Sequence, residues 1–185
     1  MFIATEVTPN PATLKFMPGR DVAGAATRNF DTPEAAQASP LAAALFGLGD
    51  VSGVFFGEDF VSVTKAEGAM DWAELKPLVL GVLVDHFLSG AALETGDAGA
   101  APALRFDPAD AEIVEQIEAL IEARVRPAVA RDGGDIVLRG FERGIVYLHM
   151  QGACSGCPSS TATLKHGIEN LLKHYVPEVT EVRAV

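Results

Sequence analysis

A stretch with no hydrophobic period divides this chain in two and argues against a single continuous core. Residues 89–106 are mostly small and include Gly99 and Pro102, a composition typical of a flexible connector. With 185 residues, the chain has room for two small modules. We therefore predict an N-terminal module over 1–88, a linker over 89–106 and a C-terminal module over 107–185.

The N-terminal module has the pattern of a small α+β domain. Three short runs rich in β-branched and aromatic residues predict strands, two of them forming a hairpin, and two stretches with helical apolar spacing predict helices. No nucleophile-base-acid order or metal-binding histidine pair occurs in it, so we expect a structural or partner-docking role. The expected elements are strands 13–16, 51–56 and 61–65 and helices 40–46 and 71–88.

The C-terminal module reads α-β-β-α-β, which makes the whole chain α+β. Asp107 followed by Pro108 is a helix start signal, and a turn-forming Asp132–Asp135 run ends the apolar helical period. A second proline, Pro158, can begin the later helix. The expected elements are a helix from 108 to about 131, strands 136–141 and 145–150, a helix from 158 to 176 and a strand over 179–182.

The charge and hydropathy of the chain argue against a nucleic acid partner and against a membrane-spanning segment. Its net charge of -11 repels phosphate backbones and anionic membrane surfaces, so we expect no nucleic acid partner. The most apolar stretch, around 75–88, is interrupted by charged residues and a proline and is too short to span a bilayer, so we expect no membrane segment.

The only two cysteines, Cys154 and Cys157, lie between a predicted strand and a predicted helix. Such a pair in a reducing compartment binds metal or performs redox chemistry more often than it forms a structural disulfide. The positive end of a helix dipole favours thiolate over thiol, so we expect a lowered cysteine pKa. Gly152 and Gly156 allow the backbone to turn tightly around a bulky ligand.

Two thiolates do not complete a tetrahedral zinc site or a four-iron cluster. His149 is the histidine nearest the loop, and we expect it to be an ordinary strand histidine rather than a ligand. The simplest completion is a second copy of the chain related by a two-fold axis. A thioredoxin-like dithiol and a zinc site are the alternatives that the residues leave open.

Ordered motifs in both modules resemble one family, the NifU-like (Nfu) iron-sulfur scaffold proteins. The shared N-terminal motifs include Thr5-Glu6, Thr8-Pro9-Asn10-Pro11, Leu14-Lys15-Phe16, Ser39-Pro40-Leu41-Ala42, Gly53-Val54-Phe55-Phe56 and Val63-Thr64-Lys65. Those of the C-terminal module are Arg126-Pro127, Asp132-Gly133-Gly134-Asp135-Ile136, Gly152-Ala153-Cys154-Ser155-Gly156-Cys157-Pro158-Ser159-Ser160, Thr163-Leu164-Lys165, Gly167-Ile168-Glu169 and Pro177-Glu178-Val179.

This resemblance implies a carrier rather than an enzyme. In the family, the paired cysteines ligate a labile cluster shared between two protomers, so the role carries over to Cys154 and Cys157 in a homodimer. The cluster is usually [4Fe-4S], with [2Fe-2S] as the alternative, and it passes from an upstream scaffold to apo iron-sulfur enzymes. The domain order resembles the mitochondrial and alphaproteobacterial branch. Because Met1–Glu6 shows no presequence, we expect a bacterial cytoplasmic protein, although a processed organellar form would look the same.

Overall fold

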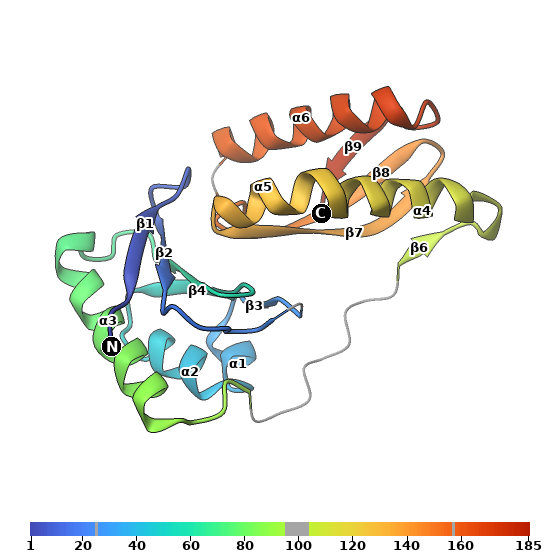
Figure 1. Cartoon of the computed structure of the whole chain (residues 1–185). Helices are drawn as coiled ribbons and strands as arrows, with labels where there is room; N and C mark the ends of the chain where they lie inside the picture. The colour runs from blue at the N-terminus through green and yellow to red at the C-terminus, as the bar shows by residue number, and fades with distance from the viewer. Residues whose placement is uncertain (25, 95–103, 157) are drawn as a thin grey trace. The chain divides into compact units, whose positions relative to one another are not determined.

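The structure is a computed structural model that describes four stretches of the chain, residues 1–24, 26–94, 104–156 and 158–185. For 158–160 it describes the backbone only. The chain forms two compact units, Met1–Gly99 and Ala100–Val185, each with its own sheet, helices and core (Figure 1). The predicted α+β class is confirmed. No helix in the described stretches is long and apolar enough to cross a membrane.

The N-terminal unit is built on a five-stranded antiparallel sheet with the order β1-β2-β5-β4-β3. Its central strands carry large apolar side chains, and Phe16 and Phe56 are fully buried. Neighbouring strands β4 and β5 form the predicted hairpin. The strands are β1 (Ala4–Val7), β2 (Thr13–Met17), β3 (Arg28–Phe30), β4 (Val51–Phe56) and β5 (Val61–Lys65).

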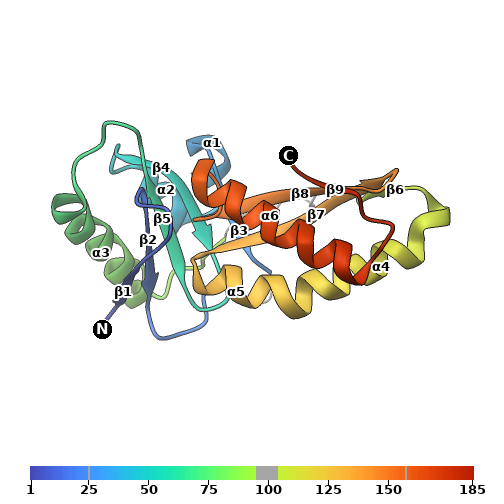
Figure 2. The ribbon, with the colours of Figure 1, turned by 90° about the horizontal axis from the view of Figure 1, so that it is seen from above.

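Two main helices lie against this sheet (Figure 2). Their apolar residues belong to the same core as those of the strands. Helix α2 (Pro40–Phe46) begins at Ser39, whose hydroxyl accepts a hydrogen bond from the Ala42 N–H at 3.2 Å. With proline at its first position, this is a well-capped start. Helix α3 (Trp72–Ser89) buries residues at helical spacing, and Gly90 ends it in a left-handed conformation with φ of 67°.

The sequence pattern predicted the central elements of this unit but not those at its edges. Strands β2, β4 and β5 and helices α2 and α3 lie where they were predicted, within a residue or two. It did not predict β1, β3 or the one-turn helix α1 (Pro33–Ala36). Both missed strands lie at the sheet edges, where few side chains are buried and the period-two signal is weak.

The C-terminal unit has a four-stranded mixed sheet with the order β6-β7-β8-β9. The central pair is antiparallel and joined by a two-residue turn at Arg143 and Gly144, whose φ angles are 52° and 83°, whereas both outer pairs are parallel. Alternate residues of β8 are buried, so one sheet face meets the core. The strands are β6 (Arg105–Phe106), β7 (Gly134–Glu142), β8 (Ile145–Gly152) and β9 (Glu181–Ala184).

A π-helical turn interrupts the first long helix of this unit. Helix α4 (Ala111–Leu120) and helix α5 (Arg126–Arg131) are joined by the turn at Ile121–Val125, where the Arg126 N–H bonds the Ile121 carbonyl, five residues back. Pro127 explains the local change because it has no N–H to donate and its ring obstructs the regular ladder. The apolar spacing had predicted one continuous helix from 108 to about 131.

The structure differs from the prediction at both ends of the proposed linker, 89–106. Its middle, residues 95–103, lies outside the described residues. On one side, Glu94 makes a 2.8 Å ion pair with Arg28. On the other, Arg105–Phe106 form β6, which pairs with Gly140 and Phe141 of β7. An ion pair at one end and a strand pairing at the other thus make contacts that small-residue composition did not reveal.

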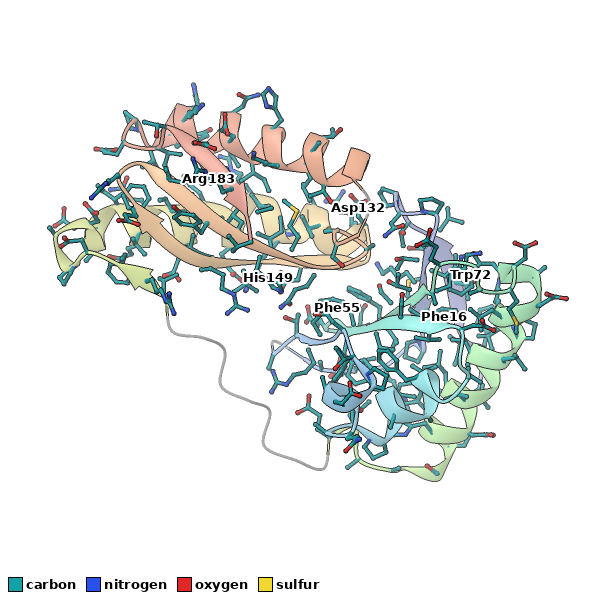
Figure 3. The ribbon with its side chains drawn as sticks, turned by 180° about the vertical axis from the view of Figure 1, so that it is seen from behind. Phe16, Phe55, Trp72, Asp132, His149 and Arg183 are labelled. Carbon is teal, nitrogen blue, oxygen red and sulfur yellow. The ribbon has the colours of Figure 1, made fainter. Side chains whose placement is uncertain are left out.

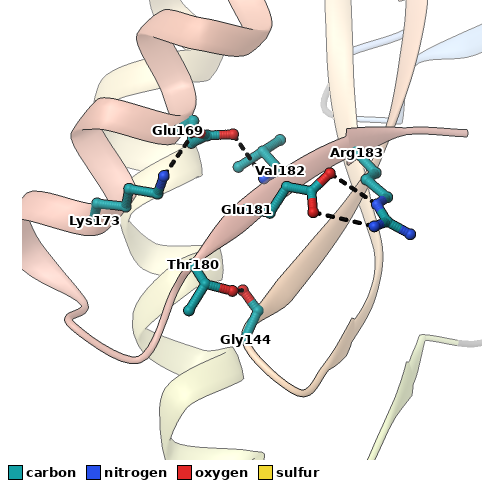
Figure 4. Close-up of polar contacts among 7 residues, drawn as sticks. All are labelled: Gly144, Glu169, Lys173, Thr180, Glu181, Val182 and Arg183. Atoms are coloured by element: carbon teal, nitrogen blue, oxygen red, sulfur yellow. Dashed lines mark hydrogen bonds and ion pairs between the residues drawn. The ribbon is translucent and has the colours of Figure 1, made fainter.

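Helix α6 (Pro158–Tyr175) holds the edge strand β9 through one carboxylate. Glu169 accepts a hydrogen bond from the Val182 N–H at 3.0 Å and another from the Lys173 ammonium at 2.7 Å (Figure 4). The bond from Lys173, followed by that from Val182, lowers the pKa of Glu169. The Glu169 carboxylate therefore binds the Val182 N–H of the edge strand β9, which would otherwise be free to bond to another chain.

Replacing Glu169 with alanine is expected to lower the free energy of unfolding by about 1 kcal/mol near neutral pH, because the β9 donor loses its acceptor. A depressed carboxyl pKa stabilises the fold above the unfolded-state pKa, and this contribution disappears as pH falls through the folded-state value. Lys173→Ala is the matched control, with a loss below about 0.5 kcal/mol. Urea unfolding at neutral and acidic pH measures both; equal losses, or a Glu169 effect that persists in acid, would contradict the assignment.

Candidate metal centre

The cysteine-bearing loop folds on itself between β8 and α6. The Cys154 N–H donates to the Gln151 carbonyl at 3.4 Å, and the Ser155 N–H and hydroxyl both donate to the Gly152 carbonyl, at 3.1 and 2.8 Å. Gly152 and Gly156 have φ angles of 63° and 81°, which a side chain would disfavour. The two glycines therefore permit the tight path that the sequence predicted.

Cys154 points into the protein rather than toward solvent. Only 6% of the residue is exposed, and it belongs to the apolar core of the C-terminal unit. The carbonyl of Cys154 accepts a hydrogen bond from the Thr161 hydroxyl at 3.0 Å, which ties the loop to the first turns of α6. Its sulfur thus lies at the base of the loop, against the sheet.

The turn between α5 and β7 packs directly against that sulfur. A Cβ on Gly134 would lie 2.6 Å from Cys154 Sγ and 2.5 Å from the Gln151 carbonyl oxygen, so only glycine fits. The Ala153 N–H donates to the Gly133 carbonyl at 3.1 Å. Asp132 lies in this turn, at the same end of the unit as the cysteine loop (Figure 3).

Burial, followed by charge repulsion from the nearby carboxylates of Asp132 and Asp135, raises the pKa of the Cys154 thiol to about 12. The expectation of a lowered pKa is therefore wrong for this cysteine. The physical reason is the inward direction of the side chain: desolvation and two negative neighbours outweigh the helix dipole. Cys154 is a protonated thiol at neutral pH in this conformation.

Asp135 is held by a network that begins at the π-helical turn. Its carboxylate accepts a hydrogen bond from the Ile136 N–H at 2.7 Å and lies 3.2 Å from Arg126 Nε. Arg126 also contacts Glu122 Oε2 at 2.8 Å. The Asp132–Asp135 run was predicted to be a turn, but its contact with the cysteine loop was not predicted. The two adjacent glycines between the aspartates were the one sequence feature that indicated a close backbone contact at this turn.

The other proposed ligands divide into those that the structure describes and those that it does not. Cys157 lies outside the described residues, so its predicted role as the second ligand stays a prediction. His149 Nδ1 lies 2.8 Å from the Val185 oxygen, a contact suited to an ordinary strand histidine. No group of three or more metal-binding side chains occurs within the described stretches. The described part of one chain thus supplies Cys154 alone to this loop.

The fold and the loop define a two-domain protein whose C-terminal domain presents a paired-cysteine loop at the start of a helix. A family model described as "NifU-like domain" matches residues 117–183, and one described as "Scaffold protein Nfu/NifU N terminal" matches 3–90. The human "NFU1 iron-sulfur cluster scaffold homolog, mitochondrial" is 48% identical over 190 residues, covering 100% of this chain and 72% of the human protein. This chain belongs to the Nfu family in its two-domain form, as the resemblance predicted.

Two further relatives extend the comparison. A protein of the same name from Drosophila erecta is 49% identical over 187 residues, covering 100% of this chain and 65% of the fly protein. "NifU-like protein 5, mitochondrial" from Arabidopsis thaliana is 49% identical over 185 residues, covering 98% of this chain and 67% of the plant protein. The names of these relatives support a role in iron-sulfur cluster assembly.

The same comparison overturns the expected bacterial cytoplasmic location. The human and plant relatives are both named mitochondrial, which contradicts that expectation. The expectation rested on the first residues of the chain. Because the chain spans only 65–72% of the human and fly relatives, those residues carry no information about targeting.

Replacing Gly134 with alanine is expected to destabilise the protein by about 1–3 kcal/mol, because the new methyl group meets Cys154 Sγ and a backbone oxygen at overlapping distances. Gly167→Ala is the matched control: its Cβ meets nothing within 4 Å on α6, so alanine should stabilise the helix by about 0.5–1 kcal/mol. Urea unfolding measures both. A neutral Gly134 variant would mean that the turn does not pack against the sulfur.

The raised thiol pKa gives a second test, in metal-free Cys157→Ser protein, which retains Cys154 alone. The neutral thiol stabilises the fold below the unfolded-state pKa, and this contribution is lost as pH rises through the folded-state value of about 12. Alkylation of Cys154 should therefore be slow at neutral pH and accelerate only in strong alkali, with the urea-unfolded chain as control. Equal rates for the folded and unfolded chains would contradict burial of the sulfur.

Proposed function

We propose that this protein carries a labile [4Fe-4S] cluster between two copies of the chain, each contributing Cys154 and Cys157, and delivers it to apo-proteins. The supporting observation is the ligand shortage around Cys154: no group of metal-binding side chains in the described stretches could complete a site. A four-iron cluster takes four cysteine ligands. Two chains related by a two-fold axis supply that number, which makes the cluster the shared cargo of a homodimer.

Loading requires a change at Cys154. Because only 6% of Cys154 is exposed, its sulfur cannot reach a ligand shared with another chain, so the loop must turn the sulfur outward and the thiol must lose its proton. Gly152 and Gly156 give the loop the backbone freedom for this movement. On release, the sulfur returns to an apolar position that stabilises the metal-free form.

Delivery then proceeds by ligand exchange, without catalysis of a reaction on a substrate. Incoming cysteines of an acceptor replace the two sulfurs of each chain in turn, and an upstream scaffold loads the cluster by the same chemistry. The N-terminal unit docks partners and raises their effective concentration near the loop.

A dithiol oxidoreductase is the competing function, and the geometry around Cys154 disfavours it. An attacking thiol must be accessible and at least partly ionised near ambient pH. Cys154 is buried, with a pKa raised to about 12. Its inert state suits a ligand that is deprotonated on metal binding better than a nucleophile.

Anaerobic reconstitution with iron and sulfide tests the proposal. We expect a coloured dimer with roughly two iron atoms per chain for a four-iron cluster, or about one for a two-iron cluster. Cys154→Ala and Cys157→Ala should each lose colour and iron, whereas the His149→Ala control should retain both. Native mass and iron analysis provide the measurements. A colourless metal-free monomer, or iron held by one chain alone, would refute the proposal.

A further inference from the structure

The sulfur of Cys154 cannot reach solvent by a side-chain rotation alone. Only 6% of the whole residue is exposed, so the Cβ that carries the sulfur also lies below the surface. Rotation about the Cα–Cβ bond moves the sulfur around that carbon without moving the carbon itself. On one side the Gly134 turn blocks this rotation, because a Cβ on Gly134 would lie 2.6 Å from Sγ. Turning the sulfur outward therefore requires the Cys154 backbone to move.

Hydrogen bonds from two other elements hold this backbone in place. The Ala153 N–H donates to the Gly133 carbonyl at 3.1 Å, which joins the loop to the turn before β7. The Thr161 hydroxyl donates to the Cys154 carbonyl at 3.0 Å, which joins the loop to the fourth residue of α6. Within the loop, the bond from the Cys154 N–H to the Gln151 carbonyl is 3.4 Å long and correspondingly weak. Thr161 thus holds the Cys154 peptide from outside the loop.

The Thr161 bond depends on the direction of the cysteine side chain. The Cys154 carbonyl belongs to the backbone that carries the sulfur, so it moves when that backbone moves. Thr161 does not follow it, because α6 is fixed to the core of the unit through Ile168 and Leu172. The bond is therefore made while the sulfur points inward and is broken when the sulfur turns outward. A neutral bond of this kind changes an equilibrium roughly threefold to tenfold.

We propose that Thr161 is a positioning residue: its hydroxyl holds the Cys154 sulfur inward and thereby weakens the binding of the cluster. This role rests on the proposed cluster carriage and assigns a residue that regulates the same site. A ligand that binds only the outward state has an apparent affinity reduced by the fraction of chains in that state. Removing the hydroxyl raises that fraction, so the cluster should be bound more tightly. Loss of a merely structural residue would weaken binding instead.

Two substitutions at Thr161 separate the hydroxyl from the methyl group of the side chain. T161V keeps the branched shape without the donor, whereas T161S keeps the donor without the methyl group. T180V is the matched control, because the Thr180 hydroxyl also donates to a backbone carbonyl, that of Gly144, at 3.1 Å (Figure 4). Gly144 lies at the opposite end of the β7–β8 ladder from the cysteine loop. Circular dichroism and urea unfolding verify that all three variants fold.

Alkylation of the metal-free, full-length protein measures the position of the sulfur directly. In the Cys157→Ser background Cys154 is the sole thiol, and it reacts at a rate proportional to the fraction of chains with the sulfur outward. At one fixed pH, T161V should react roughly threefold to tenfold faster than the parent protein, whereas T161S and T180V should stay within about twofold of it. No acceleration by T161V, or an equal acceleration by T180V or T161S, would overturn the proposal.

Retention of the cluster tests the consequence in protein that keeps both cysteines. After anaerobic reconstitution with iron and sulfide, removing half of the visible absorption should take at least about threefold more dithiothreitol for T161V than for wild type or T180V. Equal or weaker retention by T161V would overturn the role of Thr161 in release. A wild-type protein that takes up no cluster, with the alkylation differences intact, would refute cluster carriage and support the hold of Thr161 on the buried thiol.

Discussion

The packing of the Gly134 turn against the Cys154 loop is the contact on which the C-terminal unit depends. Gly134 and Gly152 are the last paired residues of the β7–β8 ladder, so the turn and the loop meet where the two strands end. Helix α5 enters this point and α6 leaves it. A side chain on Gly134 would separate the turn from the loop. Helices α5 and α6 would then no longer be held at the same point of the sheet.

The π-helical turn extends this contact to the first helix of the unit. By changing the helix phase at Ile121–Val125, it allows Arg126 to reach both the Asp135 carboxylate and the Ile136 carbonyl. A buried carboxylate beside a thiol would otherwise be costly, and the guanidinium compensates its charge. The irregularity caused by Pro127 thus supports the turn beneath the cysteine loop.

The elements that could be predicted from the sequence are those whose apolar residues recur with a regular period. Alternation along β8 and helical spacing in α3 and α6 predicted those elements. The paired cysteines predicted a metal site at the loop before α6, and that assignment stays a prediction. Strand β6 has only two residues and no period to detect. The burial of Cys154 depends on contacts with the distant Gly134 turn, which spacing within the loop cannot encode. The pKa was therefore predicted in the wrong direction.

Burial of Cys154 also bears on how a carrier can release what it binds. In a rigid site, the metal-free ligands stay exposed and charged, so removing the metal leaves them unsatisfied. Here the metal-free sulfur has an alternative partner, the apolar core of its own unit, and its proton returns to it there. Under the proposed function, this alternative lowers the affinity for cargo relative to an acceptor whose ligands are held outward in advance. Delivery then has a direction without any catalysed step, because the donor relaxes into a packed state that the acceptor lacks.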